Sequence, residues 1–261
     1  MTSSTKIWIA GASGFCGRAL VDLLAQQKKF IVIPHIRPSS SRANQLIPYW
    51  RKLGLEPVVC EWHLLEEQWF NHRPQVVISC LGTTKRKAKK GGGSYQEVDL
   101  EMNQTLIRYA EELQLDQQKY NEVRPRHMVY ISSMGSEWGR WNAYLRPRLL
   151  VEQSLQASTL HYSIIKPGIL HGESRDETRI GETVGAHFSQ ILATFFAFCG
   201  FKKLSYHVKP LDAPELAQFL VLLIGEIVEG QTRKGVQYPI TEIHSTLAEL
   251  TKTSHNQQLD G

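Results

Sequence analysis

The sequence is poor in cysteine and has no long apolar run, and both shortages restrict the kind of protein it can encode. Only four of its 261 residues are cysteine, and they lie far apart without a C-x-x-C pair, so neither a disulfide framework nor a zinc site is expected. The longest apolar stretch, 188–201, covers about 14 residues, fewer than the ~20 that span a bilayer. The amino terminus lacks the apolar segment of a secretory signal. These features favour a reducing, cytoplasmic location, with no metal and no membrane contact.

The charge and composition are those of an ordinary globular protein. The chain carries 30 Lys and Arg against 25 Asp and Glu, a formal charge of +5, and 42% of its residues are hydrophobic. This balance excludes disordered and fibrous proteins. The densest charge run, 85–90, is followed by glycines, and three interpretations stay open: a solvated loop, a flap over a ligand site and a nucleic-acid or nuclear-import patch. Because no aromatic residue interleaves with these lysines, nucleic-acid binding is not expected.

Short apolar stretches alternate with helical patterns along the first two thirds of the chain. The predicted strands are 6–10, 30–36, 56–60, 75–81, 127–132 and 161–165. Helical spacing lies between them, at 99–113 and 148–156 among others. Apolar strands that alternate with amphipathic helices are typical of an α/β fold. We therefore expect a doubly wound parallel sheet of the Rossmann type, with helices on both faces.

A glycine-rich turn separates the first predicted strand from the first predicted helix. Its residues are Gly11, Ala12, Ser13, Gly14, Phe15, Cys16 and Gly17, a G-x-x-G-x-x-G pattern. In this setting the glycines permit a tight turn and a close approach of the backbone to a pyrophosphate, and the helix N-terminus faces the phosphates. The turn predicts dinucleotide binding; the alternative is a plain tight turn.

The residue after the second strand indicates which dinucleotide is bound. Arg37 stands where an acidic residue would contact the adenosine ribose hydroxyls, and no Asp or Glu occurs between Asp22 and Glu56. Because an arginine suits a 2′-phosphate, NADPH is favoured over NADH. The alternative is a solvated surface arginine.

The pattern becomes irregular beyond residue 172, and this change predicts how the chain is organised. Residues 1–172 are expected to form the NAD(P)-binding core, and 173–253 an irregular substrate-side part of the same domain. Within that part, Asp212 followed by Ala-Pro-Glu is a helix-start signal. The polar residues 254–261 are predicted to be a disordered tail.

A candidate acid/base group follows the fifth predicted strand. Tyr144 and Arg148 are spaced i, i+4, which places them on one face of a helix. A tyrosine with the ordinary pKa of about 10 is a slow acid/base at neutral pH, and a nearby cation favours the phenolate form. The alternative is a structural tyrosine beside a surface arginine. Trp138 and Trp141 precede Tyr144 and are either walls of a substrate cleft or core anchors.

Taken together, these residues resemble the short-chain dehydrogenase/reductases. The resemblance covers roughly residues 6–172 and is closest to an atypical branch, the Tat-interactive-protein-type NAD(P)H-binding oxidoreductases, which is NAD-dependent epimerase/dehydratase-like. The motifs that carry it are the glycine turn, Cys80-Leu81-Gly82-Thr83-Thr84, Val98-Asp99, Ile131-Ser132-Ser133-Met134-Gly135, Tyr144 with its cation, and Lys166-Pro167-Gly168.

The resemblance implies a role for each matching residue. Ser133 would orient a substrate carbonyl, Tyr144 would pass a proton to its oxygen, and Arg148 would stand for the lysine that binds the nicotinamide ribose. The resemblance implies further cofactor contacts. Gly82 would lie on the adenosine side, Glu61 at the adenine, and Pro167 and Gly168 at the nicotinamide carboxamide, and Leu81 is a further cofactor-binding candidate.

Two positions depart from the family pattern and keep several functions open. Arg148 replaces a lysine, and its planar fork differs from a compact ammonium. Pro147 is compatible with a helix that starts near residue 146 but would kink one that starts at Asn142. The leading prediction is an NADPH-dependent oxidoreductase acting on a small carbonyl or alcohol. The alternatives are a catalytically weak NADPH-binding redox sensor or protein-interaction module, and a sugar-nucleotide-type epimerase or dehydratase.

Overall fold

The computed structural model describes residues 4–83, 93–116, 126–168, 170–171, 209–232 and 234–259, with side chains up to residue 252 apart from that of residue 171. The basic run 85–90 and the apolar stretch 188–201 lie outside these ranges, as do the predictions made for them.

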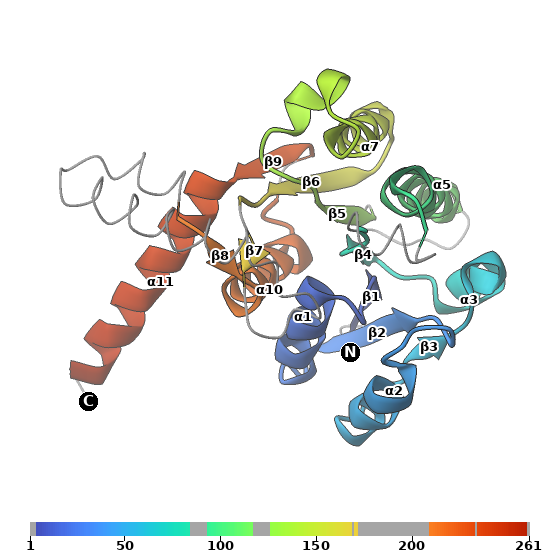
Figure 1. Cartoon of the computed structure of the whole chain (residues 1–261). Helices are drawn as coiled ribbons and strands as arrows, with labels where there is room; N and C mark the ends of the chain where they lie inside the picture. Colours follow the sequence, from blue (N-terminus) through green and yellow to red (C-terminus); the bar gives the residue numbers. More distant parts are fainter. Residues whose placement is uncertain are drawn as a thin grey trace.

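Seven parallel strands form the central sheet in the order β3-β2-β1-β4-β5-β6-β9 (Figure 1). These strands are β1 (Thr5–Ala10), β2 (Phe30–Ile36), β3 (Val58–Val59), β4 (Val76–Ser79), β5 (His127–Ile131), β6 (His161–Lys166) and β9 (Val236–Pro239). Two short strands, β7 (Leu170–His171) and β8 (Leu211–Asp212), pair separately. Because the chain turns back past β1 to reach β4, the sheet is doubly wound, and the predicted fold class is confirmed.

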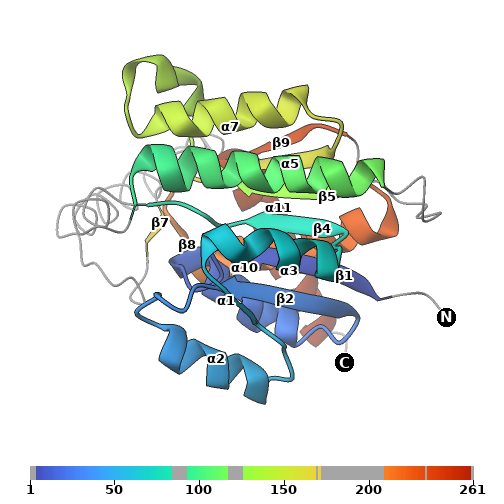
Figure 2. The same cartoon turned by 90° about the vertical axis from the view of Figure 1, so that its right-hand side faces the viewer.

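Helices cover both faces of this sheet, as Figures 1 and 2 show. The helices on one face are α1 (Phe15–Ala25), α2 (Ala43–Lys52), α10 (Ala213–Glu229) and α11 (Ile240–Leu259). Those on the other face are α3 (Leu65–His72), α5 (Met102–Leu115) and α7 (Leu145–Ala157). The described elements also include two 3-10 helices, η1 (Trp62–Leu64) and η3 (Ser136–Trp141), and one π-helix, η2 (Tyr95–Glu101).

The strands feed two separate apolar cores because successive side chains of a strand point to opposite faces. On β1, Ile7 and Ile9 join the core under α1 and α10, whereas Trp8 joins the core under α3, α5 and α7. The same alternation continues on β5, where Tyr130 faces α7 and Ile131 faces the opposite side. This alternation decides which face each residue beyond the strand end can reach.

Local signals explain where several elements begin. Asp212 caps α10 through a capping box: its Oδ1 accepts from the Glu215 amide at 2.7 Å, and the Glu215 carboxylate accepts from the Asp212 amide at 3.0 Å. The Ser94 hydroxyl caps η2 by accepting from the Glu97 amide, so that helical structure starts before the predicted residue 99. Strand β3 is shorter than the predicted 56–60 because it is an edge strand that pairs only with His35 and Ile36 of β2.

The carboxyl-terminal helix is longer than the sequence indicated. α11 continues to Leu259 and so includes most of 254–261, where a disordered tail was predicted. No proline or glycine interrupts 240–259, and each further helical residue adds one backbone hydrogen bond. Among the described helices, none combines the length with the hydropathy that crossing a bilayer requires.

Candidate active site

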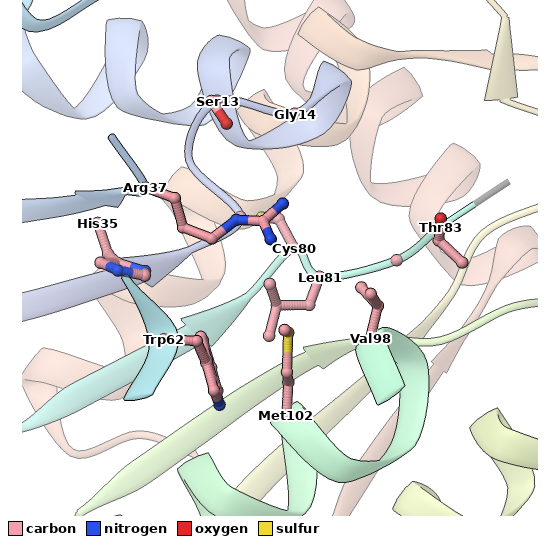
Figure 3. A pocket seen from close by; sticks show the side chains of 12 residues that line it. Ser13, Gly14, His35, Arg37, Trp62, Cys80, Leu81, Thr83, Val98 and Met102 are labelled. Carbon is pink, nitrogen blue, oxygen red and sulfur yellow. The ribbon is translucent and has the colours of Figure 1, made fainter. Parts of the chain in front are cut away.

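A cleft opens at the point where the sheet reverses its strand order. β1 and β4 are neighbours, and the chain leaves β1 for α1 on one face and β4 for η2 and α5 on the other. Ligands of doubly wound folds bind in the crevice at such a switch point, outside the carboxyl ends of the strands. The residues that line the cleft are Gly11, Ser13, Gly14, His35, Arg37, Trp62, Cys80, Leu81, Gly82, Thr83, Val98 and Met102 (Figure 3). Its volume of about 120 Å³ is below the ~300–1,000 Å³ of pockets that enclose a whole ligand, so the cleft has room for only part of a ligand of that size.

The glycine turn between β1 and α1 needs its glycines for steric reasons. Gly11 has a φ of +73°, and a Cβ there would lie 2.7 Å from the carbonyl oxygen of Cys80. A Cβ on Gly17 would lie 2.3 Å from the carbonyl oxygen of Gly11. Gly14 is the N-cap of α1 and offers no side-chain cap. The turn therefore packs closely against the end of β4, and α1 begins directly at the cleft.

Arg37 projects its guanidinium from the end of β2 into the cavity, toward Cys80 and Leu81 (Figure 3). At the same rim, the Ser40 hydroxyl donates to the Ser13 hydroxyl at 3.3 Å. The cleft therefore offers a cation and the Ser13 hydroxyl beside the glycine turn, with the Ser40 hydroxyl bound behind it, which is a favourable setting for an anionic group.

Glu61 ties two loops together at the same end of the sheet. Its Oε1 accepts from the Ser39 amide at 3.0 Å. The pKa of Glu61 is lowered by the hydrogen bonds from Ser39 and, further, by the positive charges of Arg37 and His63. The carboxylate is thus engaged with the loop that follows Arg37, and it is not among the residues that line the cleft.

The side of the cleft opposite the glycine turn is aromatic and sulfur-containing. Trp62 and Met102 lie across the cavity from Ser13 and Gly14 (Figure 3). His35 is buried there: its Nε2 faces the Cys60 carbonyl oxygen at 3.0 Å and its ring stacks on Trp8. Because a carbonyl only accepts, Nε2 is the protonated nitrogen. Burial lowers the pKa of His35 to about 4, so its ring is neutral at pH 7.

Tyr144 and Arg148 lie at the beginning of α7. Tyr144 is the N-cap of this helix and is 38% exposed. Arg148 Nη1 donates to the Tyr144 carbonyl oxygen at 2.9 Å, and its Cζ lies 4.0 Å from the centroid of the Tyr144 ring. Pro147 is the third helical residue, in the first turn, where a backbone N–H has no partner within the helix. The proline is therefore compatible with the i, i+4 contact.

Arg148 also forms a buried ion pair. Its Nη2 lies 2.6 Å from Asp99 Oδ1, and only 8% and 1% of the two side chains are exposed. Asp99 accepts in addition from the Thr83 amide at 2.8 Å. Burial raises the pKa of Asp99, while Arg148 and the Thr83 amide oppose that rise. This pair joins the loop after β4, which lines the cleft, to the helix that carries Tyr144.

Ser133 follows β5 and is half-buried, and its hydroxyl donates to the Met134 carbonyl oxygen at 3.2 Å. The next residue, Met134, donates its amide to the Pro167 carbonyl oxygen at 2.9 Å, so Ser133 and the Pro167-Gly168 segment lie side by side. Trp138 and Trp141 are 70% and 91% exposed, which excludes the core-anchor alternative.

The structure gathers the predicted site residues into two groups. The cofactor residues that line the cleft are Gly11, Ser13, Gly14, Arg37, Leu81 and Gly82. Phe15, Cys16 and Gly17 form the first turn of α1 behind them. The remaining predicted residues, Glu61, Ser133, Tyr144, Arg148, Pro167 and Gly168, are not among the lining residues.

A close approach links the cleft-lining residues to the Tyr144–Arg148 pair, and further residues that were not predicted also line the cleft. A Cβ on Gly82 would lie 3.4 Å from Arg148 Nη2, which relates the cleft to the acid/base group. Sequence reasoning assigned no site role to His35, Trp62, Cys80, Thr83, Val98 or Met102, which also line the cleft. Within the described ranges, no three His, Cys, Asp or Glu side chains are grouped so as to hold a metal ion.

Comparison with protein families agrees with this geometry. A family model described as NAD(P)H-binding matches residues 11–190, more than half of the chain. The chain therefore belongs to the NAD(P)H-binding family. No curated protein matches the sequence.

Solved structures of low sequence identity share the fold. A candidate NAD-dependent epimerase/dehydratase from Bacillus halodurans is 16% identical, with a TM-score of 0.59 over 93% of this chain and 99% of that chain. The Bordetella bronchiseptica enzyme WbmH, solved with NAD+, is 12% identical, with a TM-score of 0.57 over 90% of this chain and 75% of that one. WbmG from the same organism, solved with NAD, is 11% identical, with a TM-score of 0.58 over 96% and 79% of the two chains.

Proposed function

We propose that the chain is an NADPH-dependent oxidoreductase of the atypical short-chain dehydrogenase/reductase type, which transfers hydride to or from a small carbonyl or alcohol. The observation that carries the proposal is the cleft at the switch point, where the glycine turn and Arg37 meet. Membership of the NAD(P)H-binding family supports the class of cofactor. In this proposal residues 1–172 bind the nucleotide and 173–253 complete the substrate side of the same domain.

The chemistry of the cleft fits a dinucleotide. α1 begins at the cleft behind Gly14, so its positive dipole end is directed toward an anionic pyrophosphate. Trp62 and Met102 provide a flat, polarizable surface of the kind on which a nucleobase packs. When bound, the nicotinamide ring accepts or supplies a hydride.

The surroundings of Arg37 favour NADPH over NADH. A guanidinium forms paired, charge-assisted hydrogen bonds with a phosphate, and the Ser13 and Ser40 hydroxyls stand at the same rim. The carboxylate of Glu61, by contrast, is held by the Ser39 amide. We therefore assign the 2′-phosphate of the cofactor to Arg37 as its main partner.

Three residues carry the proposed chemistry. Ser133 orients the substrate carbonyl with its hydroxyl, and Tyr144 donates a proton to, or takes one from, the substrate oxygen. Arg148 supplies the cation next to the tyrosine ring and holds the Tyr144 backbone through its carbonyl. In this proposal Arg148 also keeps the role that the family resemblance implies, that of the cation at the nicotinamide ribose.

Two other functions have a specific observation in their favour. Similarity in fold to a candidate epimerase/dehydratase supports a reaction in which the cofactor is oxidised and reduced again within one turnover. The engagement of Arg148 by Asp99 supports a protein that binds NADPH but turns over slowly, as a redox sensor or interaction module. The first predicts conversion of substrate without net loss of NADPH. The second predicts tight binding with no turnover.

The test is an equilibrium titration of the protein with NADPH and with NADH. We expect NADPH to bind at least tenfold more tightly, about 1.4 kcal/mol. Arg37→Ala should abolish this preference, and Arg51→Ala, which removes an exposed arginine from α2, should preserve it. Equal affinities for both cofactors in the wild type would refute the role of Arg37.

Turnover is tested separately with a panel of carbonyl compounds. Tyr144→Phe should reduce kcat at least a hundredfold and leave the Kd for NADPH within twofold, because the phenol acts on substrate. Tyr49→Phe removes a hydroxyl from α2 and serves as the control. Unchanged turnover in the Tyr144 variant would remove this residue from the mechanism.

A further inference from the structure

Two polar side chains stand at the carboxyl ends of β5 and β6, directly under α7. Tyr130 on β5 and Ile164 on β6 both face α7. Ser132 lies two residues after Tyr130, and Lys166 lies two residues after Ile164. The alternation of the strands therefore turns Ser132 and Lys166 toward α7 as well. Ser132 is 6% exposed, and the Lys166 side chain is 16% exposed.

One carboxylate from α7 binds both of them. Glu152 Oε1 accepts from the Ser132 hydroxyl at 2.5 Å, and Glu152 Oε2 lies 3.0 Å from Lys166 Nζ. The Glu152 side chain is only 4% exposed. A second carboxylate, that of Glu137, lies 3.9 Å from the same Lys166 Nζ. Its side chain is 59% exposed, so solvent weakens the electrostatic attraction between the two charges. From its place on α7, the Glu152 side chain thus binds the ends of both β5 and β6.

Hydrogen bonds also hold the backbone next to Ser132 and Lys166 in place. Strand pairing continues past the end of β5, because the Ser132 amide donates to the Ile165 carbonyl oxygen at 2.8 Å and the Met134 amide to that of Pro167 at 2.9 Å. Ser133 lies between these two bonds, and the pleat turns its side chain to the face opposite Ser132. A shift of Glu152 would therefore move Ser133 and Pro167 together with α7 and its N-terminal Tyr144.

The order of strands indicates which part of the cofactor lies over this place. Arg37 follows β2 and the glycine turn follows β1. Along the carboxyl ends of the strands, the next positions belong to β4, β5 and β6. Neighbouring strands are about 4.8 Å apart, so the ends of β2 and β5 are separated by roughly 14 Å. A dinucleotide that starts at Arg37 and crosses the glycine turn extends its nicotinamide half toward β5 and β6.

We propose that Glu152 is a positioning residue that sets the seat of the nicotinamide half by clamping the ends of β5 and β6 to α7. The inference rests on the proposed function, since it requires the adenosine half to bind at Arg37. Glu152 touches neither cofactor nor substrate; it acts through Ser132 and Lys166 on the backbone that follows them.

The experiment compares two ligands that differ in the nicotinamide half: NADPH and adenosine 2′,5′-bisphosphate. Both are titrated by calorimetry into the wild type, Glu152→Gln, Ser132→Ala and the control Glu137→Gln. The glutamine has the size of the glutamate but no charge for Lys166. We expect Glu152→Gln to bind NADPH at least tenfold more weakly and the bisphosphate within twofold of the wild type, with Glu137→Gln unchanged for both.

A merely structural role gives a different pattern. Loss of general stability would weaken both ligands alike, and that result, or unchanged NADPH binding, overturns the proposal. If Glu152→Gln does not fold, Ser132→Ala decides: the proposal requires a change of at least threefold in the ratio of the two affinities. The emission of bound NADPH at saturation is a second readout, and it must differ between the wild type and these variants.

The two hypotheses fail in distinguishable ways. A wild type that binds neither ligand removes the proposed function and this inference together. A wild type that binds both, with an affinity ratio that no variant changes, removes the role of Glu152 alone.

Discussion

His35 should make the free energy of unfolding fall as the pH is lowered, and the structure gives the size of the effect. Its ring is buried between Trp8 and Trp62 and donates to the Cys60 carbonyl. Burial, as the largest cause, lowers the pKa of His35 from 6.5 to about 4. The folded protein thus resists protonation of a group that the unfolded chain protonates readily.

The sign and magnitude follow from linkage. Well above pH 6.5 the ring is neutral in both states and has no effect. As the pH falls through 6.5, the unfolded chain gains a proton that the folded chain does not take up until about pH 4. A pKa that falls from 6.5 to about 4 corresponds to about 3 kcal/mol of stability lost between these limits. The maximum slope is about 1.4 kcal/mol per pH unit.

Urea unfolding at a series of pH values measures this loss. His35→Gln is the comparison, because glutamine retains an N–H for the Cys60 carbonyl and does not titrate. Between pH 7 and pH 4 the wild type should lose about 3 kcal/mol more than the variant. His127, whose pKa burial lowers to about 3, is present in both proteins and cancels. Parallel pH profiles would refute the assignment of His35 as a buried neutral ring.

Three further predictions concern the free energy of unfolding and are checked by urea or thermal denaturation. Gly17→Ala should cost about 2–4 kcal/mol, because its Cβ would lie 2.3 Å from a backbone oxygen. Gly225→Ala, whose Cβ would meet nothing within 4 Å, should instead stabilise α10 by about 0.5–1 kcal/mol. Equal effects of the two substitutions would contradict the packing argument. Asp212→Ala should cost about 1 kcal/mol through loss of the capping box, and no change would show that α10 does not depend on its cap. Arg148→Met should cost about 3–5 kcal/mol because Asp99 is left as a buried carboxylate without its cation, and a loss below 1 kcal/mol would mean that water reaches Asp99.

The parts of the fold that depend on local pattern could be predicted from the sequence. The strand predicted at 30–36 coincides with β2, and the glycine turn lies between β1 and α1 as expected. Both signals are short-range: an apolar run bounded by polar residues, and glycines at fixed spacing. Because right-handed crossovers limit how such units combine, the doubly wound sheet followed from them.

The candidate site could be predicted only in part, since much of it depends on which distant residues meet. Nothing near Arg148 in the sequence indicates Asp99, and nothing near Glu152 indicates Ser132, 20 residues earlier. The resemblance implied a ribose-binding role for Arg148 but gave no sign of its ion pair with Asp99 or of its hydrogen bond to the Tyr144 carbonyl. Trp62 reaches the cleft because η1 places it opposite the glycine turn, which no periodicity indicates.

The two edges of the central sheet restrict how copies of this chain can associate. One described edge is β3, with two residues, and the other is β9, with four residues that end in Pro239. A strand this short offers few backbone groups to a new partner, and a proline removes a donor. Neither edge is suited to template a further strand, so the sheet resists extension from one molecule into the next. Within the part of the chain that the structure describes, the edges of this sheet therefore give little support to edge-to-edge association, and the helices and loops offer the larger surfaces.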